Sequence, residues 1–71
     1  MSDWVVVIQR DISGVGKKWV VEPDEEFGLL TKEGETVRMG DPKAIMCDSA
    51  TEAQAICDDL GWFWDYGPEV F

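Results

Sequence analysis

The only stretch of this chain with helical periodicity begins at Ser49, and it limits the fold to one helix among short strands. Ser49 and Glu52 have the S-x-x-E spacing of a capping box, in which the hydroxyl and the carboxylate each accept a free backbone N–H. Gly61 stands where a left-handed residue commonly ends a helix. We therefore predict a helix over about residues 49–60. Five apolar side chains recur at helical spacing as its core stripe: Ala50, Ala53, Ile56, Cys57 and Leu60.

The segments around this helix have the composition of short β-strands. Residues 4–9 are β-branched nearly throughout, and residues 17–22 follow them across a glycine-containing turn at 13–16, which predicts a hairpin. Pro23 should end the second strand because it has no N–H to donate. Further strands are expected on turn-bounded segments at residues 27–32, 35–39, 44–47 and 62–66.

The length of the chain allows one domain with one small core. A chain of 71 residues buries only about 60% of its unfolded surface on folding. Its 45% apolar content and four tryptophans argue against disorder. We predict a single α+β domain over residues 1–71, in which one helix covers a mostly antiparallel sheet of four to six strands. The N-terminus shows no basic leader before an apolar run, and no segment has membrane-spanning length, so a soluble cytoplasmic protein is expected.

Negative charge is concentrated in the part of the chain after Lys43, the last basic residue. The net charge of the whole chain is −9. Such a surface attracts basic surfaces and repels phosphate backbones, so we expect no direct binding of nucleic acid. Six carboxylates follow Lys43 without any counter-charge: Asp48, Glu52, Asp58, Asp59, Asp65 and Glu69.

Two of these carboxylates lie where a helix disfavours them. Asp58 and Asp59 fall in the last helical turn, where the macrodipole is negative, and each costs about 0.3–1 kcal/mol there. They either keep a solvated face charged for solubility or form part of a binding face for a basic partner. Solubility needs charge of either sign, so the complete absence of lysine and arginine after Lys43 favours a binding role.

The residues that support catalysis or hold a metal are missing. The chain has no histidine, and two cysteines alone do not make a zinc site. We expect Cys47 and Cys57 to be buried free thiols, with a disulfide or a reactive thiol as alternatives. The glycines at 14–18 and the acids at 24–26 lack the spacing of a phosphate-binding loop and of a calcium loop. We therefore expect no enzyme activity, no cofactor, no metal, no small-molecule substrate and no membrane.

Aromatic residues are the other candidates for recognition. In residues 62–66 strand alternation places Trp62, Trp64 and Tyr66 on one side and Phe63 with Asp65 on the other. Large rings fill the core of a small domain, and tryptophan and tyrosine also dominate interface hot spots. Core packing is the first interpretation of these rings. A mixed role, half core and half partner anchor, is the second, and under it we expect Trp64 and Tyr66 to contact the partner; a stacking platform for sugars or bases is a further alternative.

A chain of this size and charge, with hairpins, one capped helix and an aromatic, acidic end, resembles the small phage-encoded proteins that disable host defence, anti-CRISPR inhibitors among them. The resemblance implies an inhibitor that docks, in the host cytoplasm, on a basic nucleic-acid-binding surface of a host complex. Its carboxylates would stand where phosphates lie. These inhibitors share no motif, so no functional residue is carried over. The residues we expect to contact the partner are Asp48, Glu52, Asp58, Asp59, Asp65, Glu69, Trp64 and Tyr66.

Two other functions fit the same sequence. An immunity or antitoxin protein would neutralise a basic toxin with the same electrostatics. A plain small acidic domain would carry its charge for solubility or salt adaptation. An even distribution of acids favours the plain domain, whereas the rise in charge density after Lys43 favours binding.

Overall fold

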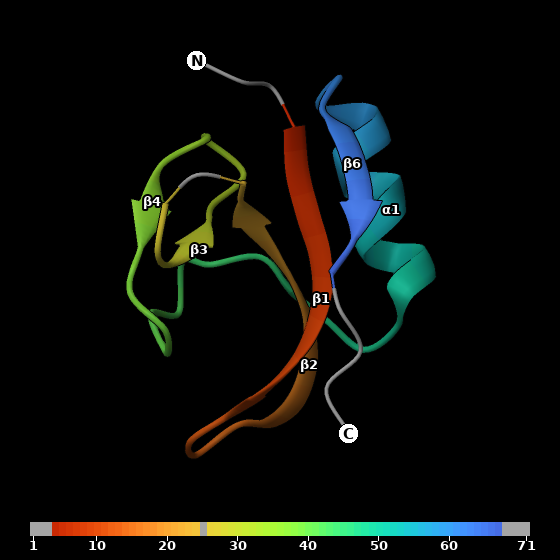
Figure 1. The fold of residues 1–71 in the computed structure, drawn as a ribbon. Coiled ribbons are helices and arrows are strands. Elements are labelled where there is room, and N and C mark those ends of the chain that lie inside the picture. Colours follow the sequence, from red (N-terminus) through yellow and green to blue (C-terminus); the bar gives the residue numbers. More distant parts are fainter. Residues whose placement is uncertain (1–3, 25, 68–71) are drawn as a thin grey trace.

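The structure, a computed structural model, describes residues 4–24 and 26–67. Within these residues it contains one helix and six strands, two of which form a long bent hairpin at the centre (Figure 1). The α+β class, the number of strands and the covering helix agree with the sequence prediction. The elements in chain order are β1 (Trp4–Ile12), β2 (Gly16–Pro23), β3 (Leu29–Leu30), β4 (Thr36–Val37), β5 (Met46–Cys47), α1 (Ala50–Asp59) and β6 (Phe63–Tyr66).

The hairpin of β1 and β2 forms the centre of a four-stranded sheet with the strand order β5-β2-β1-β6. The pairing is antiparallel and runs from Val5 opposite Pro23 to Ile12 opposite Gly16. The predicted turn is present, since Val15 N–H donates to Ile12 O at 2.9 Å and Gly14 has a φ of 81°. Pro23 is the last residue of β2, as predicted.

Strand β6 lies at the edge of this sheet and runs parallel to β1. The register places Trp4 opposite Phe63, and Val7 opposite Tyr66. Because side chains alternate along a strand, Trp64 and Tyr66 share the side of the sheet that bears Val5 and Val7. We call this the helix side, and the opposite side, which bears Val6 and Ile8, the far side.

The second predicted hairpin is present, but its strands are shorter than residues 27–32 and 35–39. Strands β3 and β4 have two residues each. Gly28 and Gly40 have φ angles of 126° and 92°, which interrupt extended backbone outside the two strands. The turn is closed by Thr31, whose Oγ1 accepts the Glu35 N–H at 3.1 Å. A bridge between Thr31 and Ala44 joins this hairpin to the segment that enters β5.

Both ends of α1 are fixed by the local interactions that the sequence predicts. Ser49 Oγ accepts the Glu52 N–H at 3.2 Å, which is one half of the capping box. At the other end Gly61 has a φ of 74°, its N–H donates to Asp58 O, and Trp62 N–H donates to Cys57 O. These two bonds form a Schellman motif, which satisfies carbonyl groups of the last turn.

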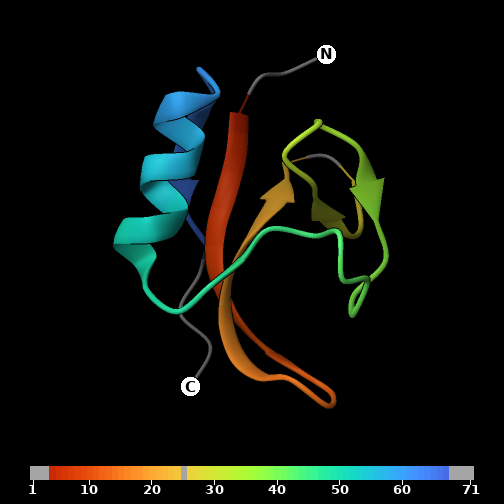
Figure 2. The ribbon, with the colours of Figure 1, turned by 180° about the vertical axis from the view of Figure 1, so that it is seen from behind.

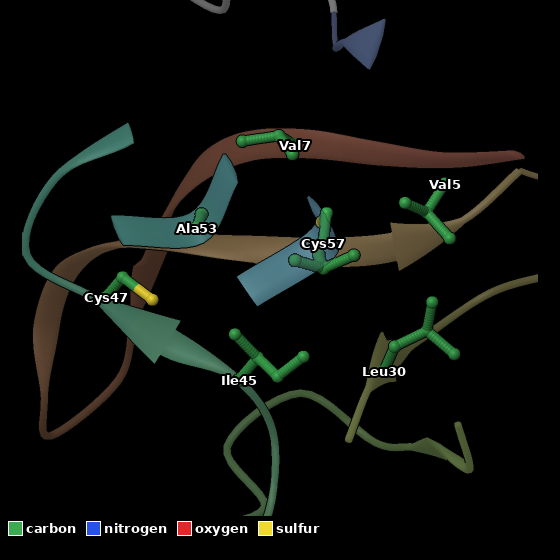
Figure 3. Packing of buried hydrophobic residues seen from close by; sticks show 8 residues of the cluster. Val5, Val7, Leu30, Ile45, Cys47, Ala53 and Cys57 are labelled. Atoms are coloured by element: carbon green, nitrogen blue, oxygen red, sulfur yellow. The ribbon is translucent and has the colours of Figure 1, made fainter. Parts of the chain in front are cut away.

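The apolar residues form two clusters, one on each side of the central hairpin. Figures 1 and 2 show α1 on one side and the hairpin of β3 and β4 on the other. The helix-side cluster, seen in Figure 3, contains Val5, Val7, Val21, Leu30, Ile45, Cys47, Ala53 and Cys57. The far-side cluster contains Ile8, Ile12, Val20, Leu29 and Ala44.

The predicted core stripe of the helix is only partly buried. Ala53 and Cys57 are fully buried, and Ile56 packs against the helix-side cluster from its edge. Leu60 does not belong to the core, because it is the cap residue beyond the last helical turn and remains 38% exposed. The helix therefore reaches the core mainly through two small side chains, which lets it lie close to the sheet.

Candidate functional site

The helix and the edge strand form one surface, which we call the α1–β6 unit (residues 50–66). Two side-chain hydrogen bonds join them. Trp64 Nε1–H donates to Asp58 Oδ1 at 3.1 Å, and the Gln54 amide donates to the Tyr66 hydroxyl. Trp64 and Tyr66 face α1 because they lie on the helix side of β6. Two of the predicted site residues, Trp64 and Asp58, are thus held against each other.

The carboxylates of α1 lie on two different flanks of the helix. At 100° per residue, Glu52 and Asp59 lie within about 20° of each other, whereas Asp58 lies about 120° away, on the flank that faces β6. Ala55, which is exposed, lies between the two flanks. All three carboxylates are exposed. The outer surface of the helix is therefore acidic on both flanks, with a small side chain between them.

The remaining predicted carboxylates do not join this helix surface. Asp48 forms an ion pair with Lys18 of β2, so this acid has a counter-charge that the order of residues along the chain does not reveal. Asp65 is exposed on the far side of β6, where its Oδ1 accepts the N–H of Tyr66 at 2.8 Å. Glu69 lies outside the described residues. The negative field thus surrounds the α1–β6 unit and does not form one flat patch.

The two aromatic residues on the helix side of β6, Trp64 and Tyr66, differ in how far they are buried. Trp64 is half-buried against the helix-side cluster, and its ring meets that of Tyr66 edge-on with centroids 5.3 Å apart. Tyr66 also makes an edge contact with Trp19 of β2 at 6.4 Å. Tyr66 remains 53% exposed. Trp64 therefore supports the unit, while Tyr66 presents part of its ring to solvent.

A second aromatic pair, which the sequence pattern does not predict, lies on the far side of the sheet. Trp4 and Phe63 are opposite each other in the parallel ladder, their ring centroids are 5.6 Å apart, and they are 51% and 61% exposed. Alternation in residues 62–66 did place Phe63 away from Trp64. The sequence does not show that β6 pairs in parallel with β1, and this pairing brings Trp4 beside Phe63.

A surface hollow of about 820 Å³ lies between the turn after β3, the segment around β5 and α1. Its lining includes the apolar residues Ala44, Ile45 and Ile56 and, from the helix, Glu52. Its charged lining has both signs: Lys32, Lys43, Glu33, Glu35 and Glu52. Mixed charge around an open hollow does not select one kind of ligand.

The two cysteines are buried free thiols, as expected from their apolar neighbours in the sequence. Burial raises the pKa of the Cys57 thiol to about 11, and the charges of Asp58 and Cys47 add to the effect. Burial also raises the pKa of Cys47, with a further contribution from Glu52. High pKa values keep both groups as thiols near neutral pH, which is the opposite of what a nucleophile or metal ligand needs.

Within residues 4–24 and 26–67, no group of three or more Cys, Asp or Glu side chains is arranged to hold a metal ion. The same part of the chain contains no helix with the length and apolar character needed to cross a membrane. Searches against protein-family models, curated proteins and solved structures found no match to this chain.

Proposed function

We propose that this protein is a non-enzymatic acidic binding protein that inhibits a host complex by docking on its basic nucleic-acid-binding surface. The observation that carries the proposal is the α1–β6 unit, whose helix presents Glu52, Asp58 and Asp59 to solvent and which contains no basic residue of its own. Carboxylates on such a surface meet lysines and arginines that otherwise bind phosphates, and they exclude nucleic acid from them. This is how an anti-CRISPR-like inhibitor in the host cytoplasm would work.

The rigidity of the unit also supports this role. The bonds from Trp64 to Asp58 and from Gln54 to Tyr66 fix the helix against the strand before any partner arrives. A preformed charged surface loses less conformational entropy on binding than a flexible acidic tail does. Exposed Tyr66 supplies the kind of aromatic anchor that is common at interface hot spots.

Affinity capture from a host lysate, followed by identification of the retained protein, tests the proposal. We expect a basic nucleic-acid-binding complex that loses its nucleic acid when this protein is added. The Glu52→Lys/Asp59→Lys variant should weaken capture by tenfold or more. The matched control, Asp11→Lys/Glu33→Lys, changes the charge equally at exposed positions outside the unit and should bind normally.

Salt dependence provides the second measurement. Affinity should fall steeply between low and moderate ionic strength if carboxylates meet basic residues. Retention of a basic toxin would support an immunity or antitoxin function in place of inhibition. If both double variants bind equally well, the α1–β6 unit is not the docking surface and the proposal fails.

A further inference from the structure

Trp4 and Phe63 form an exposed aromatic pair on the far side of the sheet. The two residues are each more than half exposed, and their ring centroids lie 5.6 Å apart, although both side chains are large enough to stabilise a core. Asp65 lies two residues along β6 on the same side, which corresponds to about 7 Å of strand. An exposed carboxylate is therefore next to an exposed aromatic face.

The extent of this surface is set by the backbone at Gly67. Its N–H donates to Val7 O at 2.9 Å, and a Cβ at this position would lie 2.7 Å from Ile8 Cδ1. The chain thus lies directly on the far side of β1 immediately after β6 and covers Ile8 there. The open part of β6 on this side is limited to Phe63 and Asp65.

The far side of the sheet has a cation further along β1, but that cation is already engaged. Arg10 forms a two-bond ion pair with Glu22, with Nε to Oε2 at 2.7 Å and Nη2 to Oε1 at 3.1 Å. This hydrogen bond raises the pKa of Arg10 above its ordinary value. Asp65 accepts only a backbone N–H among the hydrogen bonds described for it, so its negative charge is not neutralised by that contact.

We propose that Trp4, Phe63 and Asp65 form a binding site for an arginine side chain of the basic partner. A guanidinium stacks flat on an aromatic face while its N–H groups bond a carboxylate, so one side chain satisfies both features. A lysine ammonium is a compact point charge and does not combine the two contacts in this way. The inference rests on the proposed function, because it requires a basic partner, and it names the residue type that the site selects.

A second copy of this chain is a poorer occupant than a basic partner. Two copies repel each other because each carries a net charge of −9. The arginine that a second copy would offer is Arg38, which is exposed and has no ion pair with another described residue, whereas Arg10 is paired with Glu22. Sedimentation of the protein alone tests this: a monomer supports the proposal, and a dimer that Phe63→Leu dissociates overturns it.

The decisive experiment compares three synthetic peptides with four arginines, four lysines or four glutamines and otherwise identical Gly-Ser sequences, titrated at low ionic strength. We expect the arginine peptide to bind at least fivefold more tightly and to shift the indole signal of Trp4. Phe63→Leu and Asp65→Asn should each remove this preference. The matched controls, Phe27→Leu and Asp24→Asn, alter a fully exposed phenylalanine and an exposed aspartate outside the site and should retain it.

The outcomes separate this inference from the proposed function. Equal affinity for the arginine and lysine peptides, with both exceeding the glutamine peptide, would leave basic docking in place and overturn the arginine site. A preference for arginine that survives Phe63→Leu would also overturn it. If neither charged peptide binds better than the glutamine peptide, the electrostatic proposal fails as well. Asp65→Asn retains an oxygen acceptor for the Tyr66 N–H, so its effect reports charge and not loss of the strand.

Discussion

The indole N–H of Trp64 donates to the carboxylate of Asp58 at 3.1 Å and joins the last strand to the last turn of the helix. This bond explains an acid at a position where the helix dipole disfavours one. The negative charge makes Asp58 a stronger acceptor for the indole than a neutral side chain would be. Asp58 therefore has a structural role within the α1–β6 unit, in addition to the binding role that its charge suggests.

We predict that the hydrogen bond between Trp64 and Asp58 contributes about 0.5–1 kcal/mol to the free energy of unfolding, and that Trp64→Phe loses at least this amount. Asp58→Ala removes the same bond but also relieves the unfavourable interaction with the helix dipole, so its net loss should be smaller. The double variant should lose no more than Trp64→Phe alone. Urea unfolding of the four proteins, analysed as a double-mutant cycle, measures the coupling.

Asp59→Ala is the control for this cycle, since it removes the neighbouring charge of the same helical turn. It should leave stability unchanged or raise it by about 0.3–1 kcal/mol, because it removes an unfavourable interaction with the dipole. If Asp59→Ala destabilises the protein as much as Asp58→Ala does, the bond to Trp64 is not the reason for the effect.

The helix could be predicted from the sequence because its signals are local. The cap at Ser49 and the termination at Gly61 depend on residues within a few positions of each other. The hairpin of β1 and β2 could be predicted for the same reason. The lengths of β3 and β4 could not, because the backbone at Gly28 takes a conformation that only the complete fold requires.

The candidate site could be predicted only in part, because its geometry depends on contacts between distant segments. The pairing of β6 with β1 brings Phe63 beside Trp4, and these residues are far apart in the sequence. The same holds for the ion pair of Asp48 with Lys18. The sequence gives the number of charges, whereas only the fold shows which of them are paired.

Gly67 packs so closely against the far side of β1 that it has no room for a side chain. A Cβ there would lie 2.7 Å from Ile8 Cδ1 and 2.9 Å from Val6 Cγ1, which is closer than atoms pack. We predict that Gly67→Ala lowers the free energy of unfolding by about 1–3 kcal/mol, as overpacking commonly does. Thermal and urea unfolding measure the loss.

A second substitution gives this prediction its control. Ile8→Val removes the Cδ1 atom and alone costs about 0.5–1.5 kcal/mol as a buried truncation. In the Gly67→Ala background the same change should cost less or restore stability, because it relieves the closest contact. Simple additivity of the two effects would contradict the steric explanation.

The buried thiols predict a defined pH dependence. The pKa of Cys57 is about 11 in the folded protein, compared with an ordinary value of 9.0. Below pH 9 both the folded and the unfolded states hold the proton, so titration of this thiol does not change the stability there. Between pH 9 and 11 the unfolded state loses the proton first, so stability falls as pH rises. The free energy of unfolding should be measured for wild type and for Cys57→Ala across this pH range. The difference between the two isolates the effect of Cys57, because lysine and tyrosine titration is common to both proteins.

Thiol reactivity provides a second readout of the same property. A rise of two pKa units lowers the thiolate fraction at pH 8 about 100-fold. We therefore expect a thiol-specific reagent to modify Cys57 far more slowly in the native protein than in urea. Rapid modification at pH 8 without unfolding would show that the thiol is neither buried nor raised in pKa.

Strand β6 is an edge strand of the four-stranded sheet. In a parallel ladder alternate residues direct their backbone groups away from the neighbouring strand, and the bond from Gly67 N–H to Val7 O places Trp64 and Tyr66 in that outward set. The Tyr66 N–H already donates to the Asp65 carboxylate at 2.8 Å, so this edge donor is not available to another strand. Native sheets cover or block exposed edges to prevent pairing between them. Asp65→Ala should therefore cause concentration-dependent self-association in sedimentation, whereas Asp65→Asn, which makes the same change in net charge but keeps an oxygen acceptor, should remain monomeric. If both variants associate equally, net charge and not the covered N–H keeps this edge from pairing.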